Sequence, residues 1–177
     1  MDIKFEIEPI FKIEFFKIKC INFKNKKKHI EKILKKFPEK SFPNFYSNRG
    51  NADIVWELQE IFKDEFNLIH TKYNNKISVK DAWSVTYDKG HYHVPHNHGS
   101  KGYAGIIYLQ IKKDSPKTTY IQPWNDEKDK SVLYTPEVKE GDIMIVPQFL
   151  THYTEPNKTF FKKRIISFDF HLEPVLF

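Results

Sequence analysis

The sequence ISVKDAWSVTY at residues 77–87 begins a part of the chain in which short runs of β-branched and aromatic residues alternate with turn residues. Runs of this length and composition are typical of β-strands. Four further runs follow, at Tyr103–Ile111, Thr118–Ile121, Ile143–Val146 and Arg164–Leu172. Short antiparallel strands protect their edges by curling into a double sheet or a closed barrel. Residues 76–172 therefore predict an all-β unit of the jelly-roll or barrel type.

The first 75 residues predict elements that support this unit. Apolar side chains at helical spacing between Lys26 and Phe37 indicate one amphipathic helix, which Pro38 ends. A second helix is expected from Asn51, its N-cap, up to Asn74. Helices followed by strands predict an α+β, mainly β fold, with both helices packed on the sheet. Edge strands are expected where apolar residues alternate with polar ones, at Ile3, Phe5, Ile7, Ile13 and Phe15.

Length and composition favour one globular domain. A chain of 177 residues suits a single hydrophobic core, and its 16 Phe and 9 Tyr exceed what a disordered chain carries. We therefore expect residues 1–177 to form one domain, with residues 1–75 supporting a core at 76–172. The formal charge of +6 includes lysine runs at 26–28 and 35–36, which a solvated helix face also produces. Nucleic acid is for this reason not favoured as a partner.

Cysteine usage and the N-terminal sequence bear on the compartment. Cys20 is the only cysteine, so an internal disulfide is excluded and any metal must use histidines or carboxylates. Residues 1–9 alternate charged and apolar positions and lack the apolar core of a signal peptide. No apolar run reaches transmembrane length. We expect a cytoplasmic protein without a membrane partner.

Histidines are concentrated in the sequence GHYHVPHNHG at residues 90–99, which holds four of the eight in the chain. In extended backbone His96 and His98 point to the same side with Cα atoms roughly 7 Å apart, so both rings can reach one ion. A third ligand must come from elsewhere, and His152 is the best candidate because it follows a turn, a buried strand and a loop at residues 141–151. The alternative is a surface loop rich in histidine that binds metal fortuitously.

Several spaced residues occur in the same order as in a known family. They are Trp83-x3-Tyr87-x2-Gly90-x5-His96-x-His98, then Gly105-x2-Tyr108-Leu109, then the Gly141–Pro147 segment followed by His152 and Pro156, and finally Arg164. This order resembles the 2-oxoglutarate and Fe(II)-dependent oxygenases, and most closely their small prolyl-4-hydroxylase-like branch. The resemblance covers residues 77–172. It implies a double-stranded β-helix, a cupin-like jelly roll, with iron at its open end.

The resemblance implies Fe(II) held by His96, His98 and His152, with 2-oxoglutarate and dioxygen completing the coordination sphere. Most of the larger family has a carboxylate where this chain has His98. Three interpretations stay open: a three-histidine iron site, a carboxylate such as Asp88 with His98 behind it, or a site for another metal. We prefer the first, because extended backbone already places His96 and His98 together. No catalytic residue beyond the metal ligands is expected.

For the cosubstrate, the resemblance assigns the far carboxylate of 2-oxoglutarate to Arg164, since a guanidinium offers a planar, permanently charged fork. Tyr108 matches a family tyrosine that binds the same carboxylate, and Tyr87 matches a second pocket tyrosine; ordinary aromatic core explains both equally well. Ile166 shares a face with Arg164 where the family often has Ser or Thr, and Ser167 points the other way. A 2-oxoglutarate-independent, three-histidine dioxygenase of the cupin type is therefore an alternative.

The implied reaction is decarboxylation of 2-oxoglutarate to succinate, coupled to hydroxylation of a substrate C–H bond. His91, His93 and Trp124 are candidates to line the mouth of the site and contact the substrate, although an exposed loop explains the two histidines as well. The substrate class, small molecule or protein side chain, is open because loops set specificity. A non-catalytic metal-binding cupin module is a further alternative, which would need neither Arg164 nor Tyr108.

Overall fold

The computed structural model describes residues 12–50 and 52–174. Its helices are α1 (Phe23–Lys36), α2 (Ala52–Ile61) and α3 (Lys63–Tyr73). Its strands are β1 (Phe16–Lys19), β2 (Lys40–Phe42), β3 (Phe45–Ser47), β4 (Asn75–Tyr87), β5 (His93–His96), β6 (Tyr103–Gln110), β7 (Thr118–Asn125), β8 (Ser131–Tyr134), β9 (Asp142–Pro147), β10 (His152–Thr154) and β11 (Lys163–Pro174). The described part of the chain is therefore mainly β, with its helices in the N-terminal half.

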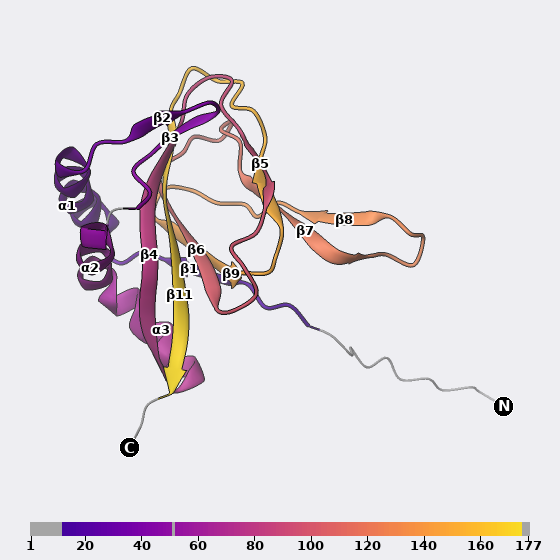
Figure 1. Ribbon diagram of the computed structural model, residues 1–177, viewed down its shortest axis with the longest axis horizontal. Helices are drawn as coiled ribbons and strands as arrows, with labels where there is room; N and C mark the ends of the chain where they lie inside the picture. The colour runs from indigo at the N-terminus through magenta and orange to yellow at the C-terminus, as the bar shows by residue number, and fades with distance from the viewer. Residues whose placement is uncertain (1–11, 51, 175–177) are drawn as a thin grey trace.

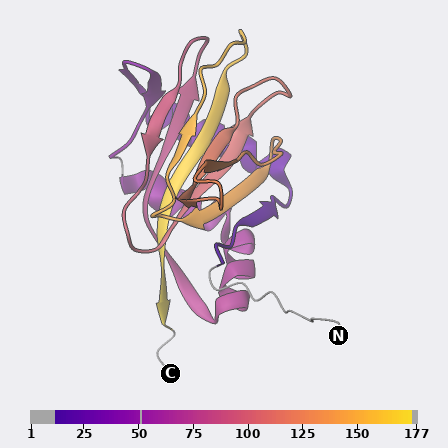
Figure 2. The same cartoon turned by 90° about the vertical axis from the view of Figure 1, so that its right-hand side faces the viewer.

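The strands form two antiparallel sheets. The larger sheet has the strand order β1-β9-β6-β11-β4-β3-β2, and the smaller sheet has the order β5-β10-β7-β8. Figure 1 shows the helices stacked along one face of the larger sheet, while the smaller sheet lies on its other side and ends in the projecting β7–β8 hairpin. The view at 90° shows the long strands β4 and β11 side by side through the middle of the molecule (Figure 2). The larger sheet is thus covered on both faces.

Side chains of β11 alternate between these two faces, as the strand repeat requires. Ile166, Phe168 and Phe170 join the cluster of buried apolar residues that the helices contribute to. Ile165 and Ser167 face the opposite way, toward the smaller sheet. The even-numbered positions of this strand therefore belong to the helix-packed core, and the odd-numbered positions from Lys163 to Asp169 belong to the space between the sheets.

The five strands expected from the sequence are confirmed, with β4, β6, β7, β9 and β11 overlapping the predicted runs. The antiparallel, mainly β class is confirmed as well. The short strands β5, β8 and β10 and the β2–β3 hairpin were not expected. They contain three or four residues each, and such lengths show too few alternations to stand out in a sequence.

The helical region needs one correction. The helix expected up to Asn74 is two helices, α2 and α3, that meet at Phe62, whose ψ of 17° lies outside the helical range. Phe62 is fully buried in the core, so its apolar side chain fits the helical pattern and the interruption is not visible in the sequence. The expected N-cap Asn51 lies outside the described residues. Buried apolar side chains of all three helices belong to one core cluster with side chains of the larger sheet.

The N-terminal strand expectation is met in part. β1 is an edge strand of the larger sheet and pairs with β9, but it begins at Phe16, just after the predicted Ile13 and Phe15. Ile3, Phe5 and Ile7 lie outside the described residues. No helix in the described ranges is long and apolar enough to cross a membrane.

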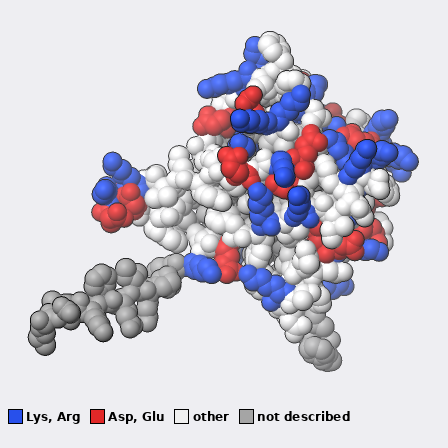
Figure 3. Space-filling view, turned by 180° about the vertical axis from the view of Figure 1, so that it is seen from behind, with Lys and Arg blue, Asp and Glu red and all other residues white. Residues whose placement is uncertain are grey.

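Charged side chains of both signs mix on the surface seen from the back of Figure 1 (Figure 3). Two lysines of the 26–28 run form ion pairs: Lys26 Nζ lies 2.7 Å from the buried carboxylate of Glu65, and Lys27 Nζ lies 3.1 Å from Glu140. These lysines therefore neutralise acidic groups within the chain, and this face carries no uniform basic patch.

Gly105 on β6 is a position where the fold requires a small residue. It lies directly opposite Phe168 on β11, and a Cβ at Gly105 would overlap the Phe168 ring. We expect Gly105→Ala to lower the free energy of unfolding by about 1–3 kcal/mol, because the ring must leave its packed position. Urea unfolding measures the change.

A double-mutant cycle with Phe168→Ala is the control for this prediction. Removing the ring removes the overlap, so Gly105→Ala should cost little in that background, and the two changes should be far from additive. Equal costs of Gly105→Ala in both backgrounds would contradict the explanation.

Candidate metal centre

Strands β5 and β10 bring three histidines together. His152 on β10 lies opposite His96 on β5, and His98 follows two residues after His96. One ring nitrogen from each of the three histidines lies within 4.8 Å of the other two. Imidazole nitrogens this close can converge on one divalent transition metal. The structure thus unites the three residues that the sequence singled out as metal ligands.

Hydrogen bonds orient all three rings. The Nδ1 atoms lie next to acceptors: His96 at 2.8 Å from the Val94 carbonyl oxygen, His152 at 3.0 Å from the Leu150 carbonyl oxygen, and His98 at 2.6 Å from Asp169 Oδ1. Carbonyl and carboxylate oxygens only accept, so each Nδ1 carries the proton and donates it. In the neutral form of each ring, Nε2 is then the nitrogen without a proton, with its lone pair available to a metal.

Burial favours the neutral form of His96 and His152. It is the largest cause that lowers the pKa of His152 to about 3 and the main cause that lowers the pKa of His96. The pKa of His93, whose ring stacks on His96 at 4.1 Å between centroids, is also lowered to about 3, again chiefly by burial. A neutral imidazole is the form that binds a metal. The His96 and His152 rings therefore need no proton loss before they can act as ligands near neutral pH.

The histidines line a cavity of about 20 Å³ between the two sheets. That volume suits an ion or a water molecule. Apolar side chains from the larger sheet form part of its wall: Val85, Ile106 and Ile165. Hydroxyl groups form another part: Thr118, Thr154 and Ser167. The placement of Ser167 on this wall means that β11 does present a serine to the site.

A buried cation, Lys163, lies against this wall. Its side chain is fully buried, its Nζ donates to Thr154 Oγ1 at 3.3 Å, and the same Nζ lies 4.9 Å from the centroid of the Tyr87 ring. Within the described ranges no carboxylate forms an ion pair with Lys163. Burial lowers the pKa of Lys163 to about 7. Because a buried ammonium without a counterion is costly, this end of the cavity favours an anion.

Two buried hydroxyl groups near Lys163 lack hydrogen-bond partners in the described part of the chain. The Tyr108 hydroxyl lies beside Thr118, yet neither side chain makes a hydrogen bond of normal geometry, and both are buried. Lys163 Nζ lies 6.0 Å from the Tyr108 ring centroid. Buried hydroxyls without partners suit a polar ligand that would complete their hydrogen bonds. Tyr87, the second predicted tyrosine, lines the cavity, and its hydroxyl lies 3.2 Å from His93 Nδ1.

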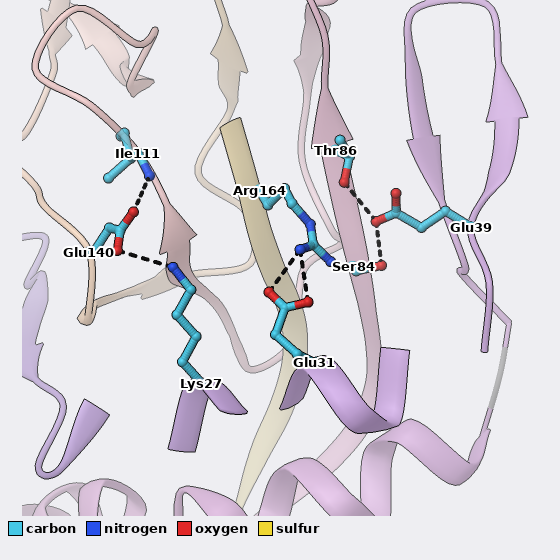
Figure 4. A network of polar contacts seen from close by, with 8 residues as sticks. All are labelled: Lys27, Glu31, Glu39, Ser84, Thr86, Ile111, Glu140 and Arg164. Carbon is cyan, nitrogen blue, oxygen red and sulfur yellow. Dashed lines mark hydrogen bonds and ion pairs between the residues drawn. The ribbon is translucent and has the colours of Figure 1, made fainter. Parts of the chain in front are cut away.

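Arg164 requires a correction. Its Nη1 lies 2.8 Å and 2.9 Å from the two carboxylate oxygens of Glu31 on α1, on the helix-covered face of the larger sheet (Figure 4). Register explains the placement: Arg164 lies opposite Thr86, whose hydroxyl contacts Glu39 on the same face, whereas Lys163 lies opposite Tyr87. The predicted contact between Arg164 and a keto acid in the cavity therefore does not fit the structure.

The remaining predicted residues are dispersed. His93 lines the cavity, but His91 packs on Tyr46 with ring centroids 5.1 Å apart. Trp124 lies at the end of β7 in the projecting hairpin, next to a separate surface groove that includes Tyr134. Asp88, the carboxylate considered as an alternative ligand, lies 3.3 Å from Lys162 Nζ and is not part of the histidine cluster.

Sequence reasoning missed two residues next to the site, Lys163 and Asp169, and one buried loop residue, Asn157. Lys163 and Asp169 occupy odd positions of β11. To predict that they face the site, one must know which face of the strand points inward, and the sequence leaves this ambiguous. Asn157 is fully buried and its amide donates to the carbonyl oxygens of Tyr87 and Phe161, which ties the loop after β10 to the end of β4. An asparagine after a proline is an ordinary loop signal, so nothing in the sequence marked this role.

Solved structures show the same fold at low sequence identity. HygX from Streptomyces hygroscopicus, solved with nickel and 2-oxoglutarate bound, matches with a TM-score of 0.68 and 14% identity over 92% of this chain and 84% of that one. A prolyl-4-hydroxylase from Pseudomonas putida matches with a TM-score of 0.63 and 7% identity over 90% and 92%. The epimerase SnoN from nogalamycin biosynthesis, described as alpha-ketoglutarate dependent, matches with a TM-score of 0.72 and 6% identity over 90% and 80%.

Sequence comparison identifies the family. No curated protein matches the chain. One family model, described as "Putative 2OG-Fe(II) oxygenase", matches residues 81–169, which is half of the 177-residue chain and includes all three clustered histidines. This match shows that the chain belongs to the 2OG-Fe(II) oxygenase family.

Proposed function

We propose that this protein is an Fe(II)- and 2-oxoglutarate-dependent dioxygenase that hydroxylates a C–H bond of its substrate. One observation carries the proposal: three clustered histidines each donate from Nδ1, so each retains Nε2 as its free nitrogen. Family membership supports the identity of the metal and of the cosubstrate. The solved relatives include an epimerase as well as a prolyl-4-hydroxylase, so hydroxylation is the finer part of the proposal.

His96, His98 and His152 are the residues that would hold the iron. Three protein ligands on one side of a metal leave its other positions open for the keto acid and dioxygen. Bound iron would let dioxygen oxidise 2-oxoglutarate and the substrate together: one oxygen atom of dioxygen enters succinate as carbon dioxide is released, and the other enters the substrate. The protein itself would bind the iron and 2-oxoglutarate, orient the substrate and exclude water.

We assign the far carboxylate of 2-oxoglutarate to Lys163 instead of Arg164. His152 and Thr154 are two residues apart on β10, so their side chains project to the same face at roughly 7 Å spacing. Lys163 Nζ contacts Thr154. The distance from the histidines to the ammonium is thus comparable to the length of a five-carbon diacid. Apolar side chains in the wall of the histidine cavity suit its methylene groups.

Tyr108 and Thr118 complete this assignment. Their buried hydroxyls would donate to the carboxylate that Lys163 attracts, which satisfies groups that otherwise lack partners. The cavity of about 20 Å³ is smaller than a keto acid. His93 narrows it by stacking on His96 and contacting Tyr87, so we expect His93 to turn aside when 2-oxoglutarate binds.

Membership of this oxygenase family also bears on the type of β fold. We infer that the facing sheets form the double-stranded β-helix of this family, with the site between β5, β10 and the inner face of β11. The substrate is proposed to be a small molecule or a protein side chain, acted on in the cytoplasm. His93 is the candidate substrate contact among the described residues that line the cavity.

Loss of one ligand should abolish iron binding. His152→Ala and His98→Ala each leave two histidines, which hold a divalent ion poorly, so we expect no tight Fe(II) binding and no succinate from 2-oxoglutarate. Anaerobic Fe(II) titration followed by admission of oxygen measures both. His91→Ala is the matched control for iron binding, since His91 packs on Tyr46 away from the cluster. Intact iron binding and turnover in His98→Ala would contradict a three-histidine site.

The neighbouring residues Lys163 and Arg164 provide a matched test of cosubstrate binding. Lys163→Met should weaken 2-oxoglutarate at least ~30-fold while iron still binds, because losing a buried charge partner costs about 2 kcal/mol or more. Arg164→Met should leave the affinity close to wild type. The charge-transfer absorbance of the anaerobic Fe(II) complex, titrated with 2-oxoglutarate, gives both affinities. The reverse ranking would show that Arg164 turns inward in solution.

The buried lysine should also produce a pH dependence of stability. The unfolded chain keeps the Lys163 proton up to about pH 10.4, whereas the folded protein releases it near pH 7 because burial lowers the pKa to about 7. The unfolded state therefore binds more protons between these values, and stability rises with pH across that window by at most about 1.4 kcal/mol per unit.

Lys163→Met isolates this contribution, because the other titrating groups are the same in both proteins. We expect the stability difference between the variant and the metal-free wild type to be largest below pH 7 and to shrink from pH 7 toward pH 10. Urea unfolding across that range measures it. A difference that does not change with pH would mean that Lys163 keeps an ordinary pKa.

A further inference from the structure

We propose that Asp169 is a positioning residue that supplies, through His98, the negative charge that a three-histidine iron site lacks. The inference rests on the proposed function, since it requires a metal on His98. It concerns the position at which most of the larger family has a carboxylate ligand and this chain has a histidine. The carboxylate would act from behind the ring instead of at the metal.

Geometry places Asp169 directly behind His98. Its Oδ1 lies 2.6 Å from His98 Nδ1, and the two side chains are 11% and 5% exposed. A hydrogen bond of this length to a carboxylate is of the strong, charge-assisted kind. Asp169 occupies an odd position of β11, on the face that holds the site, so the strand itself directs the carboxylate toward the histidines.

The Asp169 carboxylate makes a single direct polar contact among the described residues. His98 is the one residue there that the structure records as a hydrogen-bond or ion-pair partner of the Asp169 side chain. A buried carboxylate is costly unless a positive charge lies near it. A divalent ion on Nε2 of His98 would provide that charge across a single imidazole ring.

Charge arithmetic gives the contact a chemical role. Three neutral imidazoles leave a divalent iron with its full charge of about +2, whereas two imidazoles and one carboxylate reduce it by about one unit. Asp169 brings the same unit of negative charge behind the His98 ring, one residue removed from the ion. A carboxylate hydrogen-bonded to a ligating histidine fixes its tautomer and makes the ring a stronger donor.

The surroundings hold this pair in place. The His98 backbone N–H donates to the Gln148 carbonyl oxygen at 3.0 Å, and the Trp83 ring lies 5.5 Å from the imidazole between centroids. Asp169 itself lies between two neighbouring strands, opposite Ala104 on β6 and Asp81 on β4. Both members of the pair are therefore anchored by backbone as well as by packing.

Asp169→Asn tests the role of the charge. The asparagine is nearly isosteric and keeps an oxygen that can accept from His98, so it removes the charge with little change of shape. Asp126→Asn is the matched control: it makes the same change in the turn of the β7–β8 hairpin, where Asp126 accepts from the backbone N–H groups of Lys128 and Lys130. Two quantities are measured anaerobically on the full chain: the Fe(II) affinity, by competition with a chelator, and the Fe(III)/Fe(II) reduction potential.

We expect Asp169→Asn to weaken Fe(II) binding by about 10–100-fold and to raise the reduction potential, because removing negative charge destabilises Fe(III) more than Fe(II). Asp126→Asn should match the wild type in both. Wild-type affinity and potential in Asp169→Asn would overturn this inference and leave the proposed function standing. Failure of the wild type itself to bind Fe(II) would overturn both.

Wild-type protein provides a second test if Asp169→Asn does not fold. In the Co(II)-loaded chain, the Nδ1–H protons of the ligating histidines give paramagnetically shifted NMR signals. We expect the His98 proton, buried against a carboxylate, to be detected and to exchange slowly with deuterium. A rapidly exchanging or missing His98 signal, with the His96 and His152 signals present, would overturn the inference.

Discussion

The alternation of side chains along β11 is the constraint on which this site depends. One face of the strand supplies Ile166, Phe168 and Phe170 to the core beneath the helices, and these large side chains leave no freedom for the strand to slip by one residue. The other face must then present Lys163 and Asp169 to the space between the sheets. Packing on one side of the strand thus determines the chemistry on the other.

Lys163 and Asp169 on that inner face carry opposite charges and have different roles in the proposed site. Lys163 and Asp169 are six residues apart, roughly 20 Å along an extended strand, so neither neutralises the other. Lys163 offers a positive group for the far carboxylate of a keto acid, and Asp169 offers a negative group behind a metal ligand. Each is buried, and the ligand that each is proposed to serve would bring an opposite charge close to it.

The sequence predicted the main strands and the histidine cluster well, because both depend on short-range patterns. Period-two alternation marks a strand such as 77–87, and the spacing of His96 and His98 is enough to place two rings on one side. It could not decide which face of β11 looks inward. Arg164 was chosen for its chemistry, yet its side chain lies on the core-packed face with Ile166 and pairs with Glu31. Asp169 escaped notice because its partner is 71 residues away.

A structure of the Fe(II) complex with 2-oxoglutarate, prepared without oxygen, tests the central claim most directly. The account predicts that Nε2 atoms of His96, His98 and His152 bind the iron and that the far carboxylate of the keto acid meets Lys163. It also predicts that Asp169 stays hydrogen-bonded to His98 without touching the metal. A carboxylate side chain bound to iron in place of His98, or a keto acid paired with Arg164, would contradict it.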